Sequence, residues 1–251
     1  MNDISKTGNR TKITAFLIVF SALYAALRPV PLGPMIGLSA QFSVSDFLPP
    51  LYGILLGPYV GGLSIIIGTF LGMAMGKAPV FMGLDFLPAL VNTLAIGFLM
   101  KRRWIPVILL NIALLVAFMV NPLTTLFIGP IPFFWLHIVA LLALISPLGR
   151  KAGRWVETLE PKFLTAGLAI LAFVGTMMQH LTGNLLTEVV LGQIIGLISP
   201  TTFSTIIWPS AFLLYPLERT LLVILSVVVG VPLVRTIKKS LLPFQNQTSR
   251  Q

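Results

Sequence analysis

The sequence predicts an all-α fold, a polytopic bundle of about eight transmembrane helices that forms a single domain over residues 1–251. Hydrophobic residues make up 56% of the chain and charged residues only 10%, and the mean hydropathy is +0.96. Soluble domains have about 25% charged residues, so this chain has too few to cover a water-facing surface. Apolar runs close to the ~18 residues needed to cross a bilayer recur along its length.

Eight apolar segments define the expected helices. The second segment is short, and Gly57 and Pro58 between it and the third predict a tight turn that makes the two a helical hairpin. Residues 185–207 are apolar but interrupted by glycine and proline, and two interpretations stay open: a re-entrant or interfacial piece, or an extension of the seventh helix. The segments are 13–29, 46–57, 60–76, 85–100, 105–127, 132–148, 163–184 and 208–236.

The distribution of basic residues predicts the orientation. With the N-terminus inside and eight crossings, only Arg28, Lys77 and Arg219 of the 17 basic residues fall in the outer half, which leaves 14 on the inner side. The positive-inside rule favours this arrangement. We therefore expect a plasma-membrane protein with cytoplasmic tails at 1–12 and 240–251. No small-residue cleavage site follows the first segment, so we expect it to be retained.

Several kinds of chemistry have no signature in the sequence. The chain has no cysteine, which excludes disulfides and thiolate nucleophiles. Zinc-protease, serine-hydrolase and phosphate-loop motifs are absent. The basic residues lie in short clusters between apolar runs, which fits a lipid bilayer as the partner and not nucleic acid. We expect no catalytic residues, metal or cofactor, and any ATP hydrolysis that drives transport must occur on another chain.

Small residues recur at helical spacing in two places. Ser64, Gly68, Gly72 and Gly76 lie on one face of the third segment, where another helix can approach closely, and we interpret them as helix packing. In the first segment, Ala22 and Ala26 form a second small-residue face, for which internal packing and partner docking both stay open.

Polar side chains gather toward the predicted outer end. An ionisable side chain in the membrane is costly, so it usually faces a cavity, a partner or the interface. In a continuous helix His180, Asn184 and Glu188 would lie at i, i+4 and i+8 on one face, where they could bind an organic ligand. Interhelical hydrogen bonds and loop positions outside the membrane are the alternatives. The candidate substrate-binding residues are Arg28, Asp46, Asp85, His180, Asn184 and Glu188.

The surroundings of these residues suggest a loop over a pocket. Arg28 and Asp46 flank a segment rich in Pro, Gly and Ser, which we interpret as an outer loop able to fold over the site. Lys77 and Asp85 lie on the next outer loop, where surface ion pairing is the alternative. Isolated polar residues, among them His137, Asn92 and Asn111, are interpreted as structural.

Several stretches resemble the substrate-binding S-components of energy-coupling factor (ECF) transporters. The first helix has an A-x-x-x-A face at Ala22 and Ala26, residues 42–47 followed by 55–58 resemble an F-S-x-x-D and L-L-G-P run, and residues 67–72 resemble the third helix of that family. The last helix, with residues 231–233, is similar more loosely. The resemblance covers about the first 100 residues well and the last 75 moderately.

The resemblance implies a membrane-embedded subunit that binds a vitamin or similar small nutrient. It also implies that Ala22 and Ala26 dock on a transmembrane T-component, which works with ATPase subunits. S-components have six helices, so the additional helical hairpin is assigned to residues 105–148. A self-sufficient ion-coupled carrier is the first alternative, and an intramembrane enzyme using His180 and Glu188 is the second.

Overall fold

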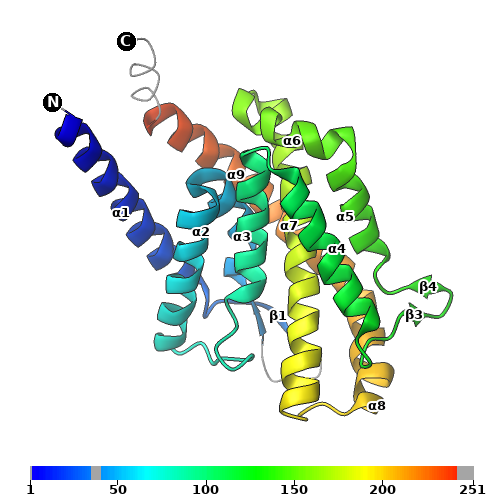
Figure 1. Ribbon diagram of the computed structural model, residues 1–251. Helices are drawn as coiled ribbons and strands as arrows, with labels where there is room; N and C mark the ends of the chain where they lie inside the picture. Colours follow the sequence, from blue (N-terminus) through cyan, green and yellow to red (C-terminus); the bar gives the residue numbers. More distant parts are fainter. Residues whose placement is uncertain (1, 35–40, 242–251) are drawn as a thin grey trace.

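The computed structural model describes residues 2–34 and 41–241, with side chains placed from 11 to 238 within them, and it confirms the all-α bundle (Figure 1). Within the described ranges, eight helices exceed ten residues. They are α1 (Asn2–Leu27), α2 (Pro49–Ala74), α3 (Leu87–Met100), α4 (Trp104–Val120), α5 (Trp135–Ile145), α6 (Pro147–Thr158), α7 (Pro161–Leu186) and α9 (Trp208–Leu241).

By helix length and hydropathy the chain is a multi-pass membrane protein. In the part of the chain that the structure describes, three helical stretches pass the length and hydropathy criteria for a membrane span: Pro49–Ala74, Pro161–Ile194 and Pro200–Lys238. The first of them turns back at Gly57 and is therefore not one straight span. The α5–α6 pair, bent by 67°, makes a fourth if it is counted as one span. Shorter apolar helices cover Thr11–Leu27, Leu87–Met100 and Trp104–Val120.

The predicted hairpin between the second and third segments is confirmed inside α2. Gly57 has φ 74° and ψ −179°, a backbone conformation open to glycine alone. A Cβ on Gly61 would lie 2.8 Å from the carbonyl oxygen of Tyr52, so the two halves of α2 lie side by side. What appears as one helix is therefore two antiparallel segments, 49–56 and 58–74.

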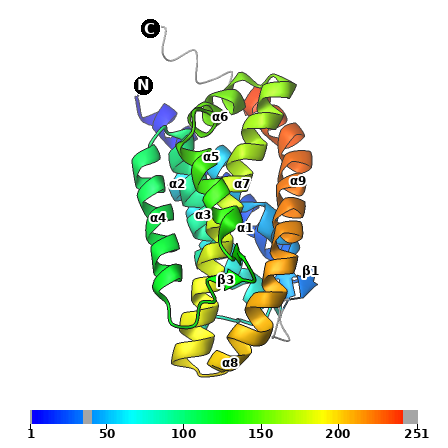
Figure 2. The ribbon, with the colours of Figure 1, turned by 90° about the vertical axis from the view of Figure 1, so that its right-hand side faces the viewer.

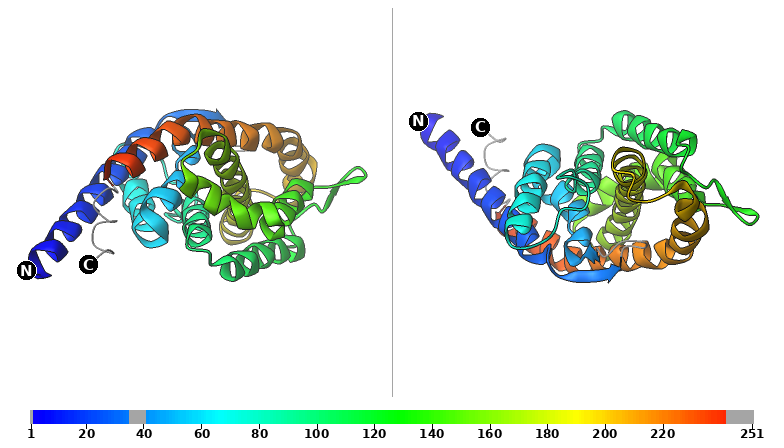
Figure 3. Two further views of the ribbon diagram at one scale, coloured as in Figure 1. Left: turned by 90° about the horizontal axis from the view of Figure 1, so that it is seen from above. Right: turned by 90° about the horizontal axis from the view of Figure 1, so that it is seen from below.

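The hairpin at 105–148 has shorter helices than predicted. The predicted helix 105–127 ends at Val120, because Asn121 takes an extended conformation and Pro122 cannot continue the hydrogen bonding. Two short strands, β3 (Phe127–Ile128) and β4 (Ile131–Pro132), then pair and project sideways from the bundle before α5 (Figures 1 and 3). The predicted helix 132–148 is divided at Ser146, which caps the short helix α6.

The segment 185–207 begins as an extension of the seventh helix. A π-helical stretch, η2 (Thr187–Ile194), continues α7, and Gly196, with φ +69°, follows its end. The chain returns through α8 (Pro200–Thr202) and η3 (Phe203–Ile207) into α9. Figure 2 shows α7 and α9 joined through α8 at one end of the molecule. The interpretation as an extension is thus confirmed for 185–194.

The glycine stripe packs α2 against α1, except at its last residue. Cβ atoms on Gly68 and Gly72 would lie within 3 Å of Ser21 and Arg28, respectively, and Ser64 is fully buried. Gly76 instead lies in the turn after α2 with φ +104° and open space around it. Its assignment to helix packing was wrong, because the helix ends at Ala74 before the stripe reaches it.

The two ends of the bundle differ in charge. The N-terminal end of α1, the α3–α4 turn, α6 and the C-terminal end of α9 lie together at the top of Figure 1. Arg102 of that turn pairs with Glu157 of α6 at 3.0 Å. Six basic residues lie on the α3–α4 turn and on α6, and we call this the basic end: Lys101, Arg102, Arg103, Arg150, Lys151 and Arg154. Residues 2–12, predicted as a tail, are already part of α1, and of the predicted tail 240–251, residues 242–251 lie outside the described residues.

Candidate functional site

A cavity lies at the end of the bundle opposite the basic end. It encloses about 690 Å³ of empty space with its open mouth included. Its walls come from the end of α1, strand β2 (Gln41–Ser43), the short 3₁₀ helix η1 (Val44–Phe47), the loop after α2, the start of α3, and α7 and α9. Five of the six predicted substrate-binding residues line it: Arg28, Asp46, Asp85, His180 and Asn184.

Strand β2 and helix η1 form one wall of the cavity. Strand β1 (Pro31–Pro34) pairs antiparallel with β2. The Ser43 hydroxyl lies 2.9 and 2.8 Å from the carbonyl oxygens of Leu27 and Arg28 at the end of α1, which share its one hydrogen as acceptors. Ser43 is also the N-cap residue of η1. Its backbone N–H donates a hydrogen bond to the carboxylate of Asp46 at 3.1 Å. This capping box holds Asp46 in place at the cavity.

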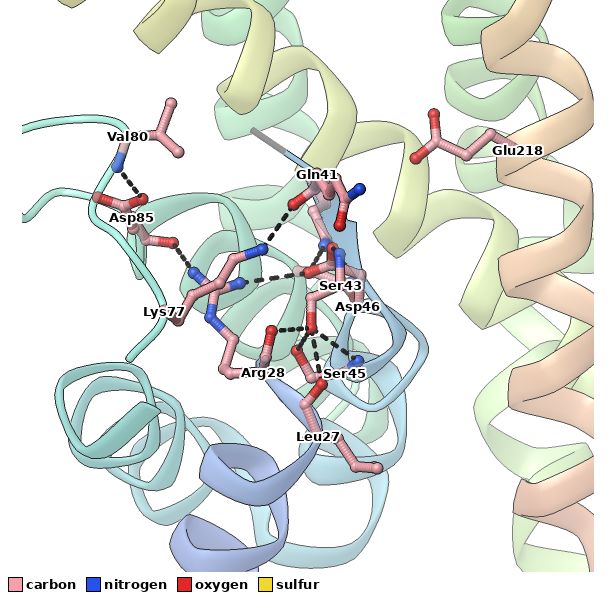
Figure 4. Close-up of polar contacts among 12 residues, drawn as sticks. Leu27, Arg28, Gln41, Ser43, Ser45, Asp46, Lys77, Val80, Asp85 and Glu218 are labelled. Atoms are coloured by element: carbon pink, nitrogen blue, oxygen red, sulfur yellow. Dashed lines mark hydrogen bonds and ion pairs between the residues drawn. The ribbon is translucent and has the colours of Figure 1, made fainter. Parts of the chain in front are cut away.

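Arg28 lies between the two acidic residues of the cavity (Figure 4). Its Nη1 is 3.8 Å from Oδ1 of Asp46, and its Nη2 is 3.5 Å from the backbone carbonyl of Asp85. Both contacts are longer than the usual 2.7–3.2 Å of a hydrogen bond from nitrogen to oxygen. Arg28 is only 8% exposed. The site therefore holds a buried guanidinium by weak contacts.

A hydrogen-bonded chain links Asp46 to the centre of the bundle. Gln179 of α7 donates to Asp46 Oδ1 at 3.2 Å and accepts from Asn92 of α3 at 2.8 Å. Asn92, interpreted from the sequence as an isolated structural residue, thus has a hydrogen-bond partner on α7. Gln179 was not among the candidates of the sequence analysis, because a contact between residues 133 positions apart leaves no local pattern.

The loop after α2 is organised by Asp85. Its carboxylate accepts the backbone N–H groups of Val80 and Phe81 at 2.8 and 3.1 Å. Lys77 reaches across the mouth and donates to the backbone carbonyl of Gln41 on β2 at 2.7 Å (Figure 4). Burial, and then the nearby charge of Arg28, lower the pKa of Lys77. The loop after α2 and strand β2 thus meet at the cavity.

The ring of His180 packs against the rings of His137 and Tyr215. Nδ1 of His180 is 3.1 Å from Nε2 of His137 on α5, and the His180 ring stacks on Tyr215 of α9 with centroids 4.9 Å apart. His137, interpreted from the sequence as an isolated structural residue, is therefore the direct support of a cavity residue. A pairing between α5 and α7 was not visible in either helix alone.

Glu188 does not share the face of His180 and Asn184. It is fully buried and does not line the cavity, and it accepts from the Thr124 hydroxyl at 2.5 Å. The reason is the π-helical stretch that starts at Thr187, which breaks the i, i+4 register between Asn184 and Glu188. The pair that an enzyme would use, His180 with Glu188, is therefore not assembled in this cavity.

Arg219 is a further cavity residue that the sequence analysis left out of the site. It forms an ion pair with its neighbour Glu218, and its guanidinium lies 5.6 Å from the ring centroid of Phe42 on β2. The three basic residues predicted for the outer half, Arg28, Lys77 and Arg219, all line this one cavity. Among the residues the structure describes, no cluster of three or more His, Cys, Asp or Glu could hold a metal.

Comparison with known proteins gives one distant relative. The chain is 25% identical over 155 residues to uncharacterized protein MJ0923 of Methanocaldococcus jannaschii, an alignment that covers 61% of this chain and 50% of that protein. The chain thus spans about half the length of the curated relative it matches. No family model matches, and no solved structure matches.

Proposed function

We propose that this protein is the membrane-embedded substrate-binding subunit of an ATP-driven uptake transporter for a vitamin or similar small organic nutrient, resembling an ECF S-component. The observation that carries the proposal is the cavity at the end opposite the basic end, lined by buried polar side chains from distant parts of the chain. A few convergent polar groups in a cavity are typical of small-molecule sites.

The surface of α1 supports docking to a T-component. Ala22 and Ala26 are exposed, while Tyr24 and Ala25 on the other side of the helix are buried against α2. The N-terminal half of α1 extends away from the rest of the bundle (Figure 3). A lipid-facing strip of small residues permits close approach of a partner helix. In this proposal the partner chains supply ATP hydrolysis.

The test separates ligand binding from uptake. We expect Ala22→Arg to abolish uptake by cells that express the partner chains and to leave ligand binding by the purified protein unchanged. The matched control is Val116→Arg, which places the same charge on an exposed position of α4, four residues before its end. Normal uptake in Ala22→Arg, or equal loss in the control, would contradict docking through this face.

One observation favours a proton-coupled carrier as a second candidate. Glu188 is fully buried, and among the residues described by the structure it has no basic partner and its Oε2 accepts no hydrogen bond. A lone buried carboxyl in a membrane bundle is a typical proton-binding group. Uptake by the purified chain alone in proteoliposomes, driven by a pH gradient and lost in Glu188→Gln, would support this candidate. ATP-dependent uptake that persists in Glu188→Gln would favour the binding subunit.

A further inference from the structure

The hydrogen-bond donors of Arg28 are largely unused. A guanidinium has five N–H donors. Among the described residues those of Arg28 make two long contacts, to Asp46 and Asp85, its Nε has no hydrogen-bond partner, and the guanidinium carbon lies 5.8 Å from the centroid of the Tyr24 ring, which accepts no conventional hydrogen bond. Leaving buried charged donors unsatisfied is costly, so such a group in a cavity wall points to an absent acceptor.

Other donors around the cavity are also unused. Asn184, which is 9% exposed, has a buried side-chain N–H₂ group without a partner. Lys77 has three donors, and its one hydrogen bond in the structure goes to Gln41. These groups come from α7 and the loop after α2, so the surplus of donors belongs to the cavity as a whole.

The carboxylates, in contrast, are engaged. Both oxygens of Asp85 accept backbone N–H groups, and both oxygens of Asp46 accept hydrogen bonds, from Ser43 and Gln179. Glu218 is engaged by Arg219. A ligand that fits this cavity therefore supplies acceptors.

We infer that the ligand is a small organic monocarboxylate, whose carboxylate group binds Arg28, with Asn184 donating to a further acceptor of the ligand. This inference rests on the proposed binding function. A planar carboxylate matches the guanidinium fork with two parallel hydrogen bonds. A phosphate monoester fits less well, because its second negative charge would face Asp46 and Asp85 in the same cavity, and like charges at close range repel strongly.

The experiment compares probes that differ only at the carboxylate. Thermal-shift titrations of the purified full chain would use nicotinate with nicotinamide, pantothenate with panthenol, and biotin with biotinamide, together with thiamine as a cation, riboflavin as a neutral probe and pyridoxal phosphate as a phosphate ester. Native mass spectrometry of the gently purified protein would identify any co-purified molecule. We expect a carboxylate to bind about tenfold or more tightly than its neutral counterpart, as a charge-assisted hydrogen bond allows.

Substitutions assign the preference to the cavity. Arg28→Gln should remove the preference for the carboxylate and leave weak binding of the neutral counterpart. Asn184→Ala, which keeps the guanidinium, should weaken binding of both. The control Arg103→Gln makes the same change at an exposed residue of the basic end and should alter nothing.

The possible results distinguish a failure of the monocarboxylate inference from a failure of the proposed binding function. Equal binding of both members of every pair, or binding of thiamine, riboflavin or pyridoxal phosphate alone, would overturn the monocarboxylate inference and leave the binding function standing. The same holds if Arg28→Gln folds and keeps the full preference. No bound molecule in native spectra and no response to any probe would overturn both.

Discussion

At Gly68 the backbones of α1 and α2 lie too close for a side chain. A Cβ there would lie 2.8 Å from the carbonyl oxygen of Ser21 and 2.9 Å from the Cβ of Tyr24. We expect Gly68→Ala to destabilise the protein by about 1–3 kcal/mol, the usual cost of overpacking. The measurement is the free energy of unfolding in detergent.

The matched control is another helical glycine, Gly183 of α7, whose Cβ would meet nothing within 4 Å. Gly183→Ala should be neutral or stabilising by up to ~1 kcal/mol, because alanine is the better helix former. Equal destabilisation by both substitutions would mean that α1 and α2 do not pack through this face.

At the same scale, the sequence identified the cavity residues that stand out as charged or polar in an apolar run. Arg28, Asp46, Asp85, His180 and Asn184 were all found this way. It missed Gln179 and His137, whose roles depend on partners on other helices. It placed Glu188 on the wrong face, since the π-helical register at Thr187 depends on packing and has no local signal.

At the scale of elements, the hairpin of α2 depends on a single backbone conformation. Gly57 adopts φ 74° and ψ −179°. A Cβ added at this residue would have Cε of Lys101 as its nearest neighbour, at 3.8 Å. Because there is room for a methyl group, the cost of Gly57→Ala comes from the backbone alone. We expect about 1–3 kcal/mol of destabilisation, measured by unfolding in detergent. A substitution without effect would show that α2 does not turn at this residue.

Turns and breaks made by Gly and Pro were the most predictable elements. The turn at Gly57 and Pro58 was found directly. Helix ends within 105–148 were not, because the apolar residues after Val120 form a loop and the β3–β4 hairpin and do not continue the helix. Apolar composition predicts contact with lipid or core, and it does not by itself distinguish a helix from an apolar hairpin.

At the scale of the whole molecule, the charge asymmetry predicts which end faces the cytoplasm. The chain has no cysteine, so single-cysteine variants can be labelled without background. Met82→Cys, at an exposed position near the cavity, should react with a membrane-impermeant maleimide in intact cells. Arg103→Cys, at the basic end, should react after permeabilisation only. The reverse pattern would contradict the positive-inside orientation.

The central claim is that the cavity holds a small organic molecule, and Gly183 offers the most direct test. It lines the cavity and has open space where a side chain would point, so Gly183→Leu should fill the site without disturbing the fold. Native mass spectrometry of the wild-type protein should show a bound small molecule that is retained in Gly183→Ala or weakened only slightly. The same adduct should be lost in Gly183→Leu at unchanged thermal stability. An adduct that persists in Gly183→Leu, or a wild-type protein without one, would contradict this assignment.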